Sequence, residues 1–133
     1  MSQENVDLVK HAYRSLDSGG EGATLETFDP GVEIDVSRTT PDRGFYRGIE
    51  GFNELMARWI ATWDDYQLDV LELIDAGETS VVAVTRERGK IKGSESWTEH
   101  TRGAVWTLSA GRIVKYEEHQ DRAAALEAAG LAG

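Results

Sequence analysis

The sequence predicts an α+β domain in which helices pack on the concave face of a cone-shaped, curled antiparallel or mixed β-sheet and enclose a pocket. Three observations predict this fold class. Four strand-like runs with a period of two follow one another between residues 66 and 120. Short segments containing glycine separate these runs, which is typical of an antiparallel meander. A strongly amphipathic helical stripe precedes the runs and can cover one face of the sheet.

Length, composition and charge limit the class of protein. The 133 residues suffice for one domain, residues 1–133, with a sizeable core. No apolar run is long enough to span a membrane, and the first residues lack the basic and apolar regions of a signal peptide. We therefore expect a cytoplasmic protein with no membrane partner. The formal net charge of −10 repels phosphate backbones, which argues against nucleic-acid binding.

The first third of the chain predicts helices and one strand. Apolar residues at helical spacing predict a helix over residues 3–16, and a short helix is expected at residues 23–28, before Asp-Pro. Residues 32–36 then alternate between apolar and polar side chains, as in a strand with two unlike faces. The apolar side chains of this strand are expected to point inward, which leaves Asp35 outside.

A polar segment and a long helix come next. Residues 38–47 form either a rim or lid over a pocket or a plain surface connection. Residues 49–62 are predicted to form a heavily buried helix, although Trp59 or Trp63, near its end, could instead line a ligand cavity. Its apolar stripe consists of Ile49, Phe52, Leu55, Met56, Trp59, Ile60 and Trp63.

The second half predicts the sheet and a closing helix. Strands are expected at residues 66–75, 79–90, 95–108 and 112–120. Gly89, Gly93 and Gly103 lie inside or beside these strands and predict bulges or bends, with Gly103 as the favoured bulge position. A last helix is expected over residues 122–129, capped by Asp121.

Four segments in this order resemble the nuclear-transport-factor-2-like superfamily, and specifically its SnoaL-like branch. They are TFDPGVEI (27–34), YRGIEGF (46–52), VWTLSAGRIV (105–114) and DRAAALEAAGL (121–131). The resemblance covers essentially the whole chain. It implies a cone with an apolar cavity that takes a small hydrophobic molecule, no cofactor, and a homodimer formed through the outer face of the sheet.

The resemblance leaves the function open, because the superfamily includes polyketide cyclases, ketosteroid isomerases, epoxide hydrolases, dehydratases and pure binding proteins. One hypothesis is a cofactor-independent isomerase, cyclase or dehydratase that uses acid–base catalysis on a carbonyl compound. The other is a non-catalytic module that binds a small molecule or a protein.

A carboxylate in an apolar cavity is the group best suited to move a proton in the first hypothesis. Glu118 is the leading candidate, because it shares a strand face with Tyr116 and falls where SnoaL-like cyclases place an acidic residue. The alternative is that Glu117 and Glu118 are a solvated acidic pair at the end of a strand.

Three other candidates could assist or replace Glu118. Asp35 falls near the base of ketosteroid isomerases, although the pattern of its own strand places it outside. His100 shares the inward parity of its strand and could act as a base or a donor. Tyr13 falls where ketosteroid isomerases have an oxyanion-binding tyrosine, although it also fits the core stripe of its helix.

The remaining site residues are expected to bind substrate. Trp59, Trp63, Trp106 and Tyr116 should form the apolar walls of the pocket. Arg86 and Arg88, alternate residues on one strand face, could bind a carboxylate or an enolate.

Two further chemistries are disfavoured by sequence pattern. Limonene-type epoxide hydrolases have Arg-x-Asp in the strand that here reads Arg88-Gly89-Lys90, so epoxide hydrolysis is not expected. The histidines form no ligand motif and the chain has no cysteine, so we expect no metal site.

Overall fold

The computed structural model describes residues 2–17, 26–40 and 44–131. Its secondary-structure elements are, in chain order, α1 (Ser2–Asp17), β1 (Phe28–Asp35), β2 (Phe45–Arg47), α3 (Gly48–Thr62), β3 (Trp63–Asp75), β4 (Ser80–Ile91), β5 (Trp97–Ser109), β6 (Arg112–His119) and α4 (Arg122–Ala128). The helices and strands expected from the sequence are present, with ends that differ by a few residues.

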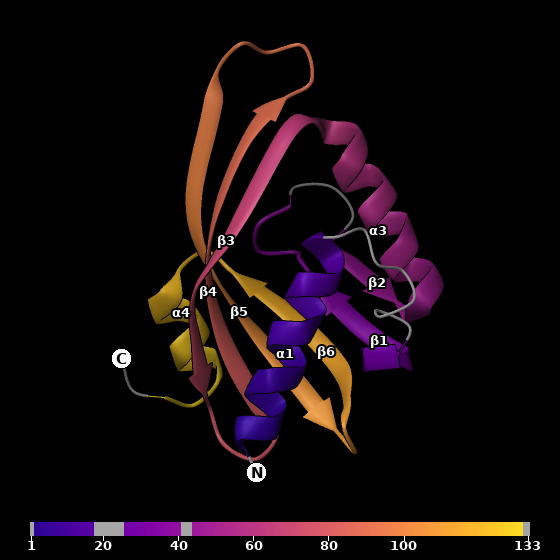
Figure 1. The fold of residues 1–133 in the computed structure, drawn as a ribbon, viewed down its shortest axis with the longest axis vertical. Helices are drawn as coiled ribbons and strands as arrows, with labels where there is room; N and C mark the ends of the chain where they lie inside the picture. Colours follow the sequence, from indigo (N-terminus) through magenta and orange to yellow (C-terminus); the bar gives the residue numbers. More distant parts are fainter. Residues whose placement is uncertain (1, 18–25, 41–43, 132–133) are drawn as a thin grey trace.

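The strands form one open, curled, mixed sheet in the order β2-β1-β6-β5-β4-β3 (Figure 1). β3 to β6 form the predicted antiparallel meander. β1 joins it by pairing in parallel with β6, while β2 pairs antiparallel with β1 and forms the edge. The predicted α+β class with a curled mixed sheet is confirmed.

Two local expectations differ from the structure at the first strands. Residues 38–47 were expected to be loop throughout, but residues 45–47 form β2, a strand too short to show any periodicity in sequence. The short helix expected at residues 23–28 falls partly outside the described residues. Residues 26–27 are helical, as expected, but Phe28 already belongs to β1 because it pairs with Ile113 of β6.

Two helices cover the concave face of the sheet and one covers the opposite face. α1 and α3 pack over a core that includes Val9, Phe52 and Trp106. α4 packs on the other face, where Leu126 contacts Val82 and Val105. α4 therefore lies on the face opposite α1, and the expectation that all helices lie on one face is wrong for α4 (Figure 1). The reason is that β4 and β5 carry buried residues on both faces of the sheet in this region.

Gly89 and Gly103 within the long strands permit close approach. A register shift between β3 and β4, at Trp63 and Asp65, lies beside Gly89. A Cβ at Gly103 would lie 2.5 Å from the carbonyl oxygen of Asp121, where α4 meets β5. A Cβ at Gly89 would lie 2.4 Å from the indole of Trp63. The β4–β5 register runs through both glycines without a shift, so the bulge expected at Gly103 is absent. The register shift between β5 and β6 lies at Thr107 and Leu108.

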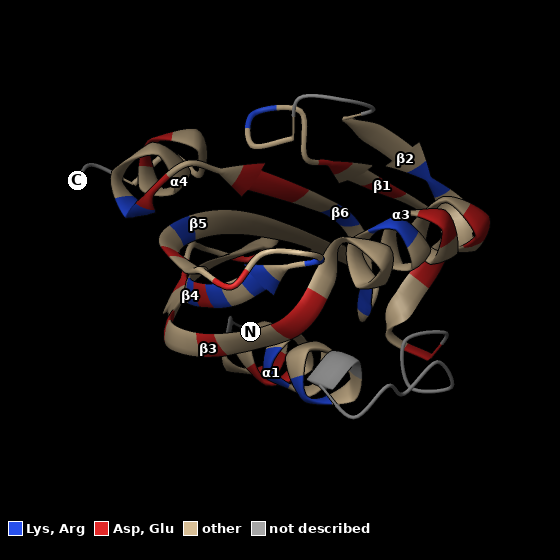
Figure 2. Ribbon diagram, turned by 90° about the horizontal axis from the view of Figure 1, so that it is seen from above, with Lys and Arg blue, Asp and Glu red and all other residues tan. Residues whose placement is uncertain are grey.

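Acidic and basic residues are distributed over the strands and helices (Figure 2). Among the residues described, no helix is long and apolar enough to cross a bilayer.

Candidate functional site

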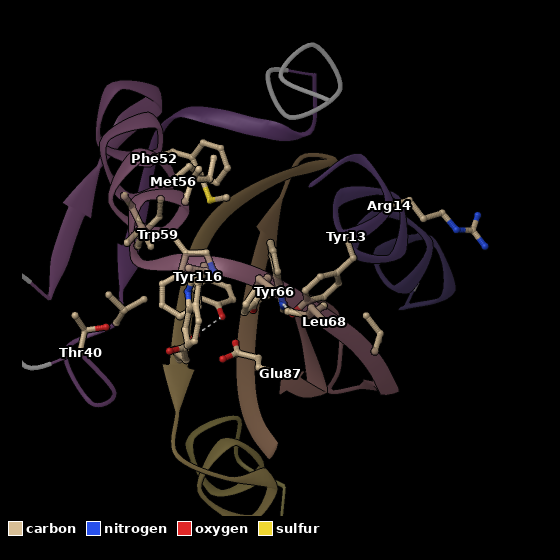
Figure 3. Close-up of a pocket in the computed structure, with 18 of the residues that line it drawn as sticks. Tyr13, Arg14, Thr40, Phe52, Met56, Trp59, Tyr66, Leu68, Glu87 and Tyr116 are labelled. Atoms are coloured by element: carbon tan, nitrogen blue, oxygen red, sulfur yellow. Dashed lines mark hydrogen bonds between the residues drawn. The ribbon is translucent and has the colours of Figure 1, made fainter. Parts of the chain in front are cut away.

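A cavity of about 570 Å³ lies between the concave face of the sheet and helices α1 and α3 (Figure 3). Its size is within the range of small-molecule sites. Most of its walls are apolar or aromatic. The lining residues are Tyr13, Arg14, Phe28, Ile34, Val36, Thr40, Phe52, Leu55, Met56, Trp59, Ile60, Trp63, Asp64, Asp65, Tyr66, Leu68, Val70, Glu87, Trp106, Tyr116 and Glu118.

The apolar stripe of α3 faces this cavity. Only Phe52 of the seven stripe residues is classed as buried, and Ile60 is 68% exposed. The expectation of a heavily buried helix is therefore wrong in degree. Ile49, Phe52, Leu55 and Met56 pack against the core, whereas the end of the stripe borders the cavity. Trp59 and Trp63 line the cavity, as the alternative interpretation of the stripe proposed.

Two groups of three aromatic rings form much of the wall. Trp59, Trp63 and Tyr66 have ring centroids 5.4 to 5.5 Å apart in every pair. The ring centroid of Trp106 lies 5.1 Å from that of Tyr13 and 4.7 Å from that of Tyr116, and both pairs are T-shaped. Edge-to-face packing of this kind stabilises the rings in fixed orientations.

Glu118 reaches the cavity from β6 and is held by two hydroxyl groups. Tyr116 donates a hydrogen bond to Glu118 Oε2 at 2.8 Å, and the Thr39 hydroxyl donates to Oε1. Thr39 and Thr40 belong to the segment after β1, so this segment contributes to the cavity wall. Charge-assisted hydrogen bonds to a carboxylate both orient it and stabilise its negative charge.

A second carboxylate, Glu87 of β4, faces the same cavity. It is 8% exposed, and its Oε2 lies 3.4 Å from Arg102 Nε of β5. Burial raises the pKa of Glu87 from its ordinary value, and the negative charge of Glu118 raises it further. Arg102 and the hydroxyl of Tyr66 oppose this shift only in part.

The tyrosine hydroxyls around these carboxylates are held in the protonated form. Burial raises the pKa of Tyr13 and Tyr116 well above the ordinary phenol value, and Glu118 raises both further. Burial and then the charge of Glu87 do the same for Tyr66. Tyr13 accepts a hydrogen bond of 3.1 Å from the indole of Trp106. These hydroxyls are therefore hydrogen-bond donors at neutral pH.

Glu118, Tyr13, Tyr116 and the three tryptophans proposed from the sequence all line the cavity. Asp35 does not. Its neighbours Ile34 and Val36 face the cavity, so Asp35 points to the other side of β1. Burial raises its pKa slightly, but hydrogen bonds from Ser37 and the charge of Arg38 outweigh burial and leave the pKa below its ordinary value. Asp35 is therefore an ion-paired surface carboxylate.

The expectation that His100 lies in the cavity is also wrong. His100 pairs with Glu87 across β4 and β5 and has the inward parity that the sequence indicated. It is nevertheless exposed, because the β4–β5 hairpin projects past the end of α3 (Figure 1). The alternation of residues along β5 predicted the correct face for His100. It could not predict where α3 ends and leaves that face exposed.

Arg86 and Arg88 lie on the outer face of β4, so they cannot line the pocket as expected. Arg86 forms an ion pair with Asp69 at 3.1 Å, and Arg88 stacks over the ring of Trp97 at 4.2 Å. Successive residues of a strand point to opposite faces of the sheet. Since Glu87 points into the cavity, Arg86 and Arg88 on either side of it point away.

Sequence reasoning missed Glu87, Tyr66 and Arg102. A signal for Glu87 was available, because it shares the parity of Val81 and Ala83, two fully buried residues of the same strand. Arg102 had a comparable signal, because it shares a strand face with Ala104 and Trp106, which are buried. The role of Tyr66 depends on the register of β3 and β4.

Comparison with known proteins identifies the family. The sequence profile of the SnoaL-like domain matches residues 9–116. The chain belongs to the SnoaL-like family. A search of curated proteins found no significant match to this SnoaL-like chain.

Solved structures share the fold of this SnoaL-like domain. A nuclear-transport-factor-2-like protein from Burkholderia thailandensis is 25% identical, with a TM-score of 0.78 over 94% of this chain and 95% of that one. A putative polyketide cyclase from Xanthomonas campestris pv. campestris is 18% identical, with a TM-score of 0.69 over 88% and 90%. An epoxide hydrolase of the LEH-like type from M. tuberculosis is 12% identical, with a TM-score of 0.70 over 90% and 80%.

Proposed function

We propose that this SnoaL-like protein is a cofactor-independent enzyme, an isomerase, cyclase or dehydratase that uses acid–base catalysis on a small hydrophobic carbonyl compound. The observation that carries the proposal is the pair of carboxylates, Glu87 and Glu118, in unlike surroundings of one largely apolar cavity. Two titratable groups whose environments differ in this way are suited to the roles of acid and base. The shared fold of a putative polyketide cyclase is consistent with this reaction class.

Glu118 is the base in this proposal. Its hydrogen bonds from Tyr116 and Thr39 stabilise its charge and aim its oxygens. In the reaction, Glu118 takes a proton from the carbon next to the substrate carbonyl, and the electron pair of that C–H bond moves towards the carbonyl oxygen.

Glu87 is the acid, in place of the exposed His100. Burial and the charge of Glu118 raise its pKa, which favours its role as proton donor, and its proton passes to the carbonyl oxygen as negative charge develops there. An enol results. Return of a proton to a different carbon completes an isomerisation, attack of the enol carbon on a second carbonyl completes a cyclisation, and loss of a leaving hydroxyl completes a dehydration.

Hydrogen exchange tests the base without knowledge of the natural substrate. A panel of small hydrophobic ketones is incubated with the protein in D₂O, and NMR follows deuterium incorporation next to the carbonyl. We expect exchange with at least one ketone, a loss of about 100-fold or more in Glu118→Gln and a smaller loss in Glu87→Gln. Arg88→Ala is the matched control, because Arg88 lies on the outer face of β4 and should leave exchange unchanged.

Exchange that stays at the solvent rate with ketones that demonstrably bind would overturn the enzymatic proposal. The non-catalytic binding module would then account for the cavity. A homodimer formed through the outer face of the sheet and a cytoplasmic location remain predictions.

A further inference from the structure

The charges around the cavity are predominantly negative. Its lining residues include four carboxylates, those of Asp64, Asp65, Glu87 and Glu118. Among the described lining residues the one cationic side chain is Arg14, and its guanidinium points away from the cavity (Figure 3). Arg102 approaches the site from β5, but it forms an ion pair with Glu87.

The aromatic walls add to this negative character. The face of an aromatic ring carries partial negative charge, and tryptophan presents the strongest such face. Two groups of three rings, centred on Trp63 and Trp106, border the same space as Glu87 and Glu118. Rings combined with carboxylates are the set of groups that recognises organic cations in water-excluding sites.

The pKa values of the surrounding tyrosines are consistent with a negatively charged cavity. Burial is the largest cause of the raised pKa values of Tyr13, Tyr66 and Tyr116, and the charges of Glu118 and Glu87 raise all three further, so the cavity resists gaining negative charge. The net charge of −10 favours the approach of cations over anions from solution.

We propose that the cavity selects an organic cation, a protonated amine with an apolar body, and rejects carboxylates of the same size. The amine would lie between the carboxylates of Glu87 and Glu118, and its apolar body would lie against the rings of Trp59, Trp63 and Trp106. This inference narrows the substrate class of the proposed function to carbonyl compounds that also carry a protonated amine, but the cation preference itself does not depend on catalysis.

Three probes of similar shape and different charge test the inference on the full-length protein. They are benzylamine, benzyl alcohol and benzoate, whose binding is followed at pH 7 by calorimetry and by the fluorescence of the cavity tryptophans. We expect benzylamine to bind at least about 10-fold more tightly than benzyl alcohol, and benzoate to bind more weakly than both.

Variants show whether the cavity causes this preference. Glu87→Gln and Glu118→Gln should each reduce the ratio of amine to alcohol affinity several-fold while leaving the affinity for benzyl alcohol nearly unchanged, which also verifies that the cavity is intact. Asp69→Asn is the matched control, because Asp69 is an exposed carboxylate paired with Arg86 outside the cavity. It makes the same change from carboxyl to amide and should leave the ratio unchanged.

Equal or tighter binding of benzyl alcohol or benzoate would overturn the inference. So would the absence of saturable binding by all three probes, or an amine preference that persists in both glutamine variants. Amine preference without exchange in ketones that demonstrably bind would refute the enzymatic proposal alone. Ketone exchange without amine preference would refute the cation proposal alone.

Discussion

Glu87 and Glu118 face one cavity from strands that are not neighbours, since β5 lies between β4 and β6. The two carboxylates interact through space, and Glu118 raises the pKa of Glu87. No hydrogen bond between the two side chains is required for this coupling, because low-dielectric surroundings strengthen the interaction of their charges. The pair therefore links the stability of the fold to pH.

The raised pKa of Glu87 predicts a specific pH dependence of stability. The folded protein holds this proton more tightly than the unfolded chain, whose carboxyl titrates near 4.5. From about that pH up to the raised pKa, the folded state binds more protons, so this group makes the free energy of unfolding fall as pH rises. The contribution of Glu87 is most favourable below the unfolded pKa.

The variant Glu87→Gln cannot lose this proton. We expect its free energy of unfolding, relative to that of the wild type, to increase as pH rises from 4.5 through the raised pKa of Glu87. Urea denaturation at a series of pH values measures the difference. A difference that is constant with pH, or that changes in the opposite direction, would contradict the assignment of a raised pKa to Glu87.

The hydrogen bond from Trp106 to Tyr13 is expected to couple the two residues energetically. Both side chains lie in the cavity wall, and the indole donates to the phenol oxygen at 3.1 Å. A double-mutant cycle of Trp106→Phe and Tyr13→Phe should give a coupling of about 0.5–1.5 kcal/mol in the free energy of unfolding. Purely additive effects would show that the contact contributes packing without a hydrogen bond.

Gly103→Ala is expected to separate α4 from the sheet. The new Cβ would meet the backbone of Asp121 at 2.5 Å and the side chain of Ala125 at 2.7 Å, so the helix must shift. We expect a loss of about 1–3 kcal/mol in the free energy of unfolding.

Gly31→Ala is the matched control for this substitution. A Cβ there would meet only the flexible carboxylate of Asp29 at 3.3 Å, so its cost should be well below that of Gly103→Ala. Chemical denaturation of both variants measures the difference. Equal losses in the free energy of unfolding would mean that α4 does not contact Gly103 closely in solution.

Asp121 caps α4 through its own side chain. Its carboxylate accepts a hydrogen bond of 2.8 Å from the backbone N–H of Ala124. Asp121→Ala should lower the free energy of unfolding by about 1 kcal/mol, whereas Asp121→Ser, which can still cap, should cost less. Thermal unfolding of the two variants provides the test, and identical midpoints would exclude a capping role.

Predictions from sequence succeeded where one periodic pattern decides one element. The meander, the inward face of Val32, Ile34 and Val36, and the last helix with its Asp121 cap follow from local alternation or spacing. Glu118 and Tyr116 share a strand face for the same reason, and both line the cavity.

What the sequence by itself determined was therefore the class of fold, the order of its elements and the face that most strand residues share. Tertiary structure decided which parts of those faces are covered. His100 and Glu87 are paired across neighbouring strands, yet one is exposed and the other is buried. The physical reason is that sequence periodicity determines the side of the strand or helix on which a side chain lies. Its burial, its coupling to other charges and its pKa depend on the elements that pack against that side. The ion pair of Arg102 with Glu87 and the charge coupling of Glu87 with Glu118 form only once the sheet has curled around the cavity.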